Sequence, residues 1–90
     1  MMMNPPHPGE LLDENINALG LTIEEAALRL GVSCEELANV AKLQAAISAD
    51  LALRLEMAGM STAQCWLRMQ INYDLAQAKR QLPRQVRALC

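Results

Sequence analysis

Residues 21–48 constrain the fold more than any other part of the sequence, because they read as two short helices separated by a glycine. In the first helix, apolar residues recur at the i, i+3, i+4 and i+7 spacing that places them on one helix face: Ile23, Ala26, Ala27 and Leu30. Thr22 and Glu25 form the pattern of a capping box at its start. Gly31 follows the last periodic residue, where a left-handed glycine commonly ends a helix. The chain is therefore predicted to turn sharply at Gly31.

The second helix is predicted to begin directly after this turn. Ser33 and Glu36 repeat the capping-box pattern, and Leu37, Val40 and Ala41 repeat the apolar spacing. The residues left on the outward face are Cys34, Glu35, Ala38, Asn39 and Lys42. Together the two helices predict a helix-turn-helix over about residues 22–42. In that motif, the outward face of the second helix enters the major groove of DNA.

Composition favours a single, all-helical domain. The chain has 90 residues, which suffice for one small core, and 52% of them are apolar although Trp66 and Tyr73 are the only aromatic residues. A core of Leu, Ala, Ile, Val and Met suits helices better than strands. The net charge of -2 provides no overall basic field, so any attraction to phosphate must come from local clusters of cations.

Several function classes find no support in the sequence. Cys34, Cys65 and Cys90 are odd in number and widely spaced, which matches neither a disulfide framework nor a zinc site and favours a reducing cytoplasm. His7 is the only histidine, and no P-loop, GxGxxG or Ser-His-Asp set is present, so we expect no metal, no cofactor and no enzyme activity. No apolar run approaches the roughly 20 residues of a membrane span, and the first ten residues do not resemble a signal peptide. We expect a soluble, cytoplasmic protein with no membrane partner.

The remaining chain divides into short segments. Residues 1–8 read as a flexible proline-rich arm, residues 9–82 as the domain and residues 83–90 as a basic tail. A first helix over 9–19 has an apolar stripe of Leu12, Ile16 and Leu19 and ends at Gly20. Ser48 is the predicted N-cap of a fourth helix, which ends at Gly59 and whose inward face is Leu51, Ala52, Leu55 and Ala58. A fifth helix over about 62–82 is predicted to open with a capping box of Ser61 and Gln64.

This last helix carries two apolar stripes, which is more than one core face requires. One stripe contains Trp66, Met69, Tyr73 and Ala76, and the other contains Leu67, Ile71, Leu75 and Ala78. A monomer would leave one stripe exposed, so we predict a homodimer with Trp66, Met69 and Tyr73 in its interface. Three alternatives stay open: the helix lies deep in a single core, Trp66 is a core anchor, or Trp66 stacks on a nucleotide base.

Four segments in order resemble the HigA-type antitoxins, a branch of the XRE family of helix-turn-helix proteins shaped like phage Cro and lambda repressor. They are His7-Pro8-Gly9-Glu10-x-Leu12, Ala27-x-x-Leu30-Gly31-Val32-Ser33, Ala46-Ile47-Ser48 with Ala52-Leu53-Arg54-Leu55-Glu56, and Trp66-Leu67-x-Met69-Gln70-x-x-Tyr73-Asp74-Leu75. The resemblance implies a compact five-helix lambda-repressor-like domain. It also implies a homodimer that binds the palindromic operator of its own operon as a repressor and neutralises a RelE-like toxin.

The second helix departs from the family pattern. Family members carry a basic or hydroxyl-rich helix and an Asn-Gly-Lys-like turn, whereas this chain has Cys34, Glu35, Glu36 and Ala38, and then Lys42-Leu43-Gln44. Two functions therefore stay open: a DNA-binding repressor and antitoxin, or a protein-binding module that kept the fold and altered its DNA-reading helix. The residues predicted to contact DNA are Ser33, Cys34, Glu35, Asn39, Lys42 and Gln44.

Each predicted contact has its own chemistry, and each has a simpler alternative. We expect Asn39 to read adenine, Lys42 to bind phosphate and the Ser33 region to offer backbone amides at the helix N-terminus. Glu35 either repels phosphate or accepts a hydrogen bond from cytosine. Cys34 is either a redox-sensitive thiol or a small residue facing DNA. The alternative for the whole face is a solvated helix surface with no ligand.

Overall fold

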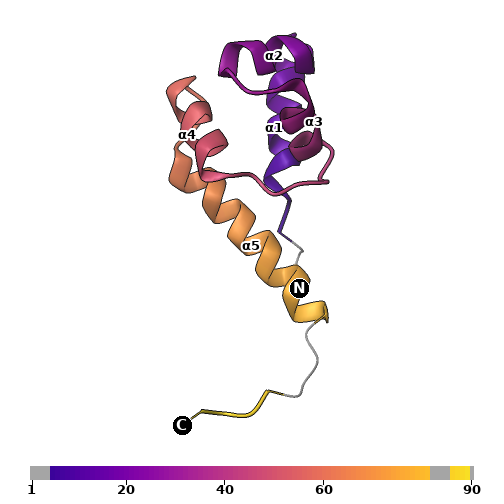
Figure 1. Cartoon of the computed structure of the whole chain (residues 1–90), viewed down its shortest axis with the longest axis vertical. Coiled ribbons are helices and arrows are strands. Elements are labelled where there is room, and N and C mark those ends of the chain that lie inside the picture. The colour runs from indigo at the N-terminus through magenta and orange to yellow at the C-terminus, as the bar shows by residue number, and fades with distance from the viewer. Residues whose placement is uncertain (1–4, 82–85, 90) are drawn as a thin grey trace.

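The computed structural model describes residues 5–81 and 86–89 and contains five helices in the first of these ranges. They are α1 (Pro8–Ala18), α2 (Ile23–Leu30), α3 (Cys34–Ala41), α4 (Ala49–Met57) and α5 (Ala63–Gln81). The described residues include no strand, so the predicted all-α fold is confirmed. The helices α1 to α3 gather at one end, and α5 extends away from them beneath α4 (Figure 1).

One apolar core joins the helices. Helix α4 packs along the start of α5, while α1 and α2 both pack on α3. Trp66 is fully buried at the base of this core, and its indole Nε1–H donates to the carbonyl oxygen of Met60 at 2.6 Å. The other apolar residues of the core are Leu12, Ile16, Ala26, Ala27, Leu37, Val40, Ile47, Leu51, Ala52, Leu55 and Ala63.

Three of the four predicted N-caps are present. Thr22 and Glu25 form both hydrogen bonds of a capping box, and the Thr22 amide lowers the pKa of the Glu25 carboxyl. The hydroxyls of Ser33 and Ser48 accept from the third amide of their helices, at 3.0 and 3.1 Å.

The prediction for the start of α5 was one residue early. Ser61 adopts a left-handed backbone with φ of 62°, and the hydroxyl of Thr62 accepts from the Cys65 amide instead. The carboxylate of Glu56 also accepts from the Ala63 amide at 2.7 Å, so α4 contributes a cap to α5.

The apolar stripes of the shorter helices were also slightly too long. Leu19 and Ala58 were predicted to face inward, but both are exposed because they lie in the turns that follow α1 and α4. Gly20 and Gly59 come next and take positive φ angles of 74° and 89°, as expected for residues that follow a helix.

The N-terminal boundary of the domain lies earlier than predicted. His7 and Pro8 were assigned to a flexible arm, but His7 is 3% exposed and Pro8 is the first residue of α1. The imidazole Nδ1 of His7 accepts from the Gly9 amide at 2.9 Å and so caps α1. A Cβ at Gly9 would overlap the carbonyl oxygen of Val40, so glycine lets the start of α1 lie directly against the end of α3.

The structure describes only part of the predicted N-terminal arm and C-terminal tail. Residues 1–4 of the predicted arm, and Arg84 with the rest of 82–85 and Cys90, lie outside the described residues. Residues 86–89 carry no helix and are exposed. No helix in the described part of the chain is both long and apolar enough to cross a membrane.

We expect the free energy of unfolding to fall as the pH drops below about 6.5. Burial lowers the pKa of His7 from its ordinary value of 6.5, although the nearby carboxylates of Asp74 and Glu10 and a backbone hydrogen bond with Ala45 oppose this. Between the two pKa values the unfolded chain binds more protons, so acidification favours unfolding until the folded-state pKa is passed. Above pH 6.5 the neutral imidazole keeps its cap, and this contribution is constant.

Chemical denaturation at pH 7.5 and pH 5.5 measures this loss. The matched control is His7→Asn, whose amide can cap the helix but does not titrate. Because His7 is the only histidine, the variant should lose most of the decrease in stability between these pH values. An equal decrease in both proteins would show that His7 is not responsible.

Candidate nucleic-acid interface

Helix α3 presents a polar face at the surface of the domain. Leu37 and Val40 are buried on one side of it, and the opposite side carries Glu35, Asn39 and Lys42. Glu35 and Lys42 are exposed, whereas Asn39 is half-buried. The predicted outward face is therefore present, but Ala38 and Asn39 are half-buried rather than fully exposed.

The turn before α3 fixes where this face begins. Gly31 adopts a left-handed φ of 75°, as predicted, and its amide donates to the carbonyl oxygens of Ala27 and Leu28. The hydroxyl of Ser33 caps α3, so its oxygen already accepts one hydrogen bond before any ligand is considered. Cys34 is the first residue of α3 and is an exposed free thiol.

The segment after α3 makes a tight turn without glycine. Leu43 takes a left-handed φ of 64°. The amides of Gln44 and Ala45 both donate to the carbonyl oxygen of Asn39, which closes this turn on the end of α3. Lys42 is the C-cap of α3, and both Lys42 and Gln44 are exposed. This conformation is uncommon for leucine, so the sequence did not indicate it.

A shallow groove of about 370 Å³ runs between α3 and the segment that leads to α4. It brings together three of the six predicted DNA contacts, Ser33, Glu35 and Asn39, while Cys34, Lys42 and Gln44 lie outside its lining. The other lining residues are Glu36, Val40, Ala45, Ala46 and Ser48. The polar side chains of the groove are those of Glu35, Glu36 and Asn39, with the hydroxyls of Ser33 and Ser48 beside them.

The charge of this surface is not favourable to phosphate. Lys42 is the only lysine or arginine between residues 30 and 53, and it shares the surface with Glu35 and Glu36. In the described part of the chain, the only ion pair within 4.0 Å is that of Asp50 with Arg54, so neither glutamate is neutralised by a direct partner. Electrostatic attraction to DNA would therefore be weak at this face.

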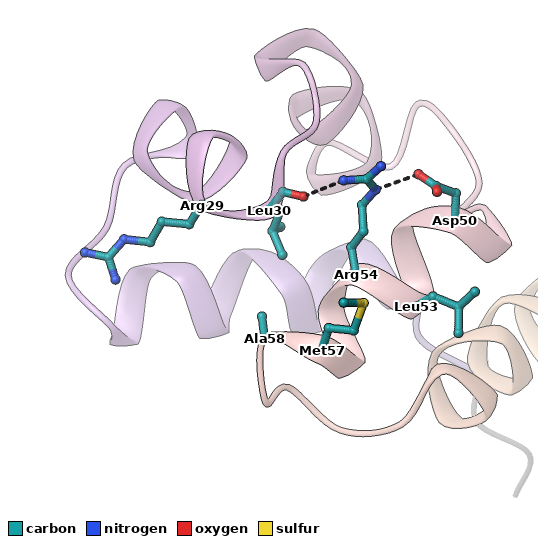
Figure 2. Close-up of a pocket in the computed structure, with 7 residues that line it drawn as sticks. All are labelled: Arg29, Leu30, Asp50, Leu53, Arg54, Met57 and Ala58. Atoms are coloured by element: carbon teal, nitrogen blue, oxygen red, sulfur yellow. Dashed lines mark hydrogen bonds and ion pairs between the residues drawn. The ribbon is translucent and has the colours of Figure 1, made fainter.

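Two polar side chains that were not predicted as functional hold the segments on either side of α3. Figure 2 shows Arg54 of α4 reaching to the turn before α3, where its Nη1 donates to the carbonyl oxygens of Leu30 and Gly31 at 2.9 and 3.3 Å. Gln70 of α5 is buried, and its Oε1 accepts from the Ile47 amide in the segment after α3 at 2.8 Å. A signal for Arg54 was the i, i+4 pair with Asp50, and a signal for Gln70 was a polar residue between two apolar stripes.

The structure buries the stripe of α5 that was predicted to form the dimer interface and exposes the other stripe. Trp66 has no exposed surface, so its assignment to a dimer interface is wrong and the alternative of a core anchor holds. Met69 is partly buried against the same core. The ring of Tyr73 lies edge-on to the imidazole of His7, with 4.7 Å between the two ring centroids. The outward stripe is the second one, in which Ile71 and Leu75 are 57% and 54% exposed.

A second groove of about 450 Å³ lies between α2 and α4, and Figure 2 shows its lining residues: Arg29, Leu30, Asp50, Leu53, Arg54, Met57 and Ala58. No group of three or more His, Cys, Asp or Glu side chains within the described residues could hold a metal ion. Cys65 is an exposed free thiol on α5.

No family model matches this sequence. Individual proteins do match: the chain is 39% identical over 89 residues to virulence-associated protein A' of Dichelobacter nodosus, covering 98% of this chain and 77% of that protein. Among solved structures, the antitoxin GraA is similar over 98% of this chain and 100% of its own, with 33% identity and a TM-score of 0.89. The Pseudomonas aeruginosa antitoxin HigA, solved with the higBA promoter, is 32% identical with a TM-score of 0.82, over 96% of this chain and 99% of its own. The helix-turn-helix of α2 and α3, together with these identities over at least 77% of each relative, shows that the chain belongs to the HigA family of helix-turn-helix antitoxins.

Proposed function

We propose that this chain is the antitoxin of a type II toxin-antitoxin module and represses its own operon by binding a palindromic operator through α3. The observation that carries the proposal is the polar face that α3 presents at the surface of this chain. The fold of the chain is similar to that of a HigA antitoxin solved with its promoter. In a helix-turn-helix, this face enters the major groove and its first residues contact base edges.

Each residue of the face has a role in this proposal. The Asn39 amide can pair with an adenine edge, and Lys42 and Gln44 at the exit of α3 can contact phosphate. Ser33 and Cys34 lie at the helix N-terminus, where backbone amides and the helix dipole attract a phosphate. Glu35 is the second residue of α3 and is exposed, so its carboxylate can accept a hydrogen bond from the amino group of cytosine.

The acidic charge of α3 supports a second candidate function. Glu35 and Glu36 are exposed near the N-terminus of α3 and face no direct cation in the described structure. A surface of this kind repels phosphate unless a base donates a hydrogen bond to the carboxylate. The second candidate is therefore a protein-binding module that retains the antitoxin fold without reading DNA.

Glu35→Gln separates these possibilities. If Glu35 reads a cytosine, the variant should bind the operator more weakly by about 1 to 3 kcal/mol while non-specific binding strengthens or stays the same. If Glu35 only repels phosphate, the variant should bind every duplex more tightly. Electrophoretic mobility shifts on the DNA upstream of the gene and on a scrambled duplex of equal length provide the measurement.

The matched control is Glu14→Gln, which removes the same charge from the exposed face of α1. This control should change the affinity for both duplexes slightly and equally, since it alters only the net charge of the protein. If neither the parent nor either variant binds the upstream DNA at low salt, the repressor function is rejected and the protein-binding module remains.

We also propose that the chain is a homodimer through the outward stripe of α5. Leu67 is half-buried against the core, and Ile71 and Leu75 follow it along the helix with more than half of each side chain exposed. Exposed leucine and isoleucine in one line are typical of a surface that another chain covers. A two-fold dimer would place two α3 helices about one DNA turn apart, roughly 34 Å.

The double variant Ile71→Glu/Leu75→Glu should shift the protein from dimer to monomer, because it places four carboxylates in the proposed interface. Sedimentation equilibrium at micromolar concentration measures the change. The control is Leu28→Glu, which adds a carboxylate at an exposed leucine of α2. A parent that is monomeric throughout, or a double variant that still forms dimers, would disprove this interface.

The partner that we propose beyond DNA is a RelE-like ribonuclease toxin, and the support for it is membership of the HigA family. We expect a small basic reading frame next to the gene whose expression alone arrests growth. Co-expression with this chain should restore growth, and the two proteins should co-purify. Absence of such a reading frame, or growth arrest that this chain does not relieve, would reject the toxin while leaving DNA binding open.

A further inference from the structure

Helix α3 has little direct packing on the part of the domain that would form the dimer. Its main neighbours are α1 and α2, while α4 packs mainly on α5. The polar contacts of α4 and α5 with this region reach the two backbone segments on either side of α3 rather than α3 itself. The position of α3 relative to α5 therefore depends on how firmly these two segments are held, in addition to α1, which packs on both helices.

Arg54 holds the segment before α3. Its Nη1 donates to the carbonyl oxygens of Leu30 and Gly31, which are free of helix partners at the end of α2. Its Nε donates to the carboxylate of Asp50 one turn earlier in α4 at 2.8 Å, so the guanidinium is oriented from both sides (Figure 2). A planar group bonded at two edges restrains the turn more than a single contact would.

Gln70 holds the segment after α3. Its side chain is 5% exposed, its Oε1 accepts from the Ile47 amide and its Nε2 donates to the carboxylate of Asp74 at 2.9 Å. A buried amide with both ends bonded has one favourable orientation, because any other would leave a polar group unpaired. Ile47 lies between the exit of α3 and the start of α4, so Gln70 links this segment directly to α5.

We propose that Arg54 and Gln70 are positioning residues that set the placement of α3 relative to α5, and thereby the spacing of the two operator half-sites that the dimer accepts. This inference rests on the proposed function. Adding one base pair between half-sites moves one of them by about 3.4 Å along the duplex and rotates it by about a tenth of a turn. A dimer whose α3 helices are firmly placed discriminates against that change, whereas one with loosely placed helices tolerates it.

The test uses duplexes that the purified parent selects from a random-sequence pool. Binding is then measured to the selected duplex and to versions with one base pair added or removed at its centre. The affinity of the parent should fall about tenfold or more on either change, which is comparable to the effect of a mismatched base pair. We call this loss of affinity the spacing penalty. Arg54→Met and Gln70→Met should bind the selected duplex more weakly and show a penalty for altered spacing of less than about threefold.

Two matched controls remove an arginine and a glutamine that make no hydrogen bond to the segments on either side of α3. Arg29→Met removes an arginine of α2 whose guanidinium points away from Arg54 and makes no hydrogen bond among the described residues (Figure 2). Gln64→Met removes an exposed glutamine of α5. Both controls should keep the full spacing penalty, and Arg29→Met should show how much affinity the loss of one charge accounts for.

Thermal melts and sedimentation of every variant separate positioning from folding. Measurements are made well below each melting temperature, and Arg54→Lys, which keeps the charge but not the planar fork, replaces Arg54→Met if the latter does not fold. Variants that melt earlier but keep the full spacing penalty would show that Arg54 and Gln70 only stabilise the fold. If the parent selects no duplex at all, the proposed DNA-binding function fails and this inference fails with it.

Discussion

The contact between the start of α1 and the end of α3 is the constraint on which the rest of the domain depends. It requires a glycine, because any side chain at Gly9 would overlap the carbonyl oxygen of Val40. His7 then caps α1 through the Gly9 amide, and its ring lies against Tyr73 of α5. One short segment therefore brings α1, the end of α3 and α5 to a common point. Helices α2 and α3 have eight residues each and would be marginal alone, so their stability comes from this packing.

The features that sequence analysis predicted correctly are local ones. Capping by Thr22, Ser33 and Ser48 depends on residues three apart, and the left-handed Gly31 depends on its place after an apolar stripe. The start of α5 was misplaced because Ser61 and Thr62 are adjacent hydroxyl residues, and periodicity does not distinguish between them. The structure distinguishes them, since the backbone turns at Ser61 before the helix begins.

The features that sequence analysis missed join residues far apart in the chain. Arg54 bonds to backbone 23 and 24 residues away, and Gln70 to an amide 23 residues away. Periodicity contains no information on such contacts. The two stripes of α5 were both recognised, but which of them faced the core depended on where α4 and α1 pack, and Trp66 proved to lie on the buried one. Leu43 escaped prediction because leucine rarely adopts the left-handed conformation that its turn requires.

The low positive charge of α3 increases the importance of its placement. Binding to phosphate grows with the number of cations that displace counterions, and the segment from 31 to 53 contributes Lys42 alone. A protein with few such contacts gains little non-specific affinity, so the operator binding that we propose would depend on base contacts made at both half-sites together. In the proposed dimer, those contacts would form only when both α3 helices fit their grooves at once. Rigid placement of α3 reduces the entropy lost on binding, and the polar side chains that provide it matter more here than on a strongly basic surface.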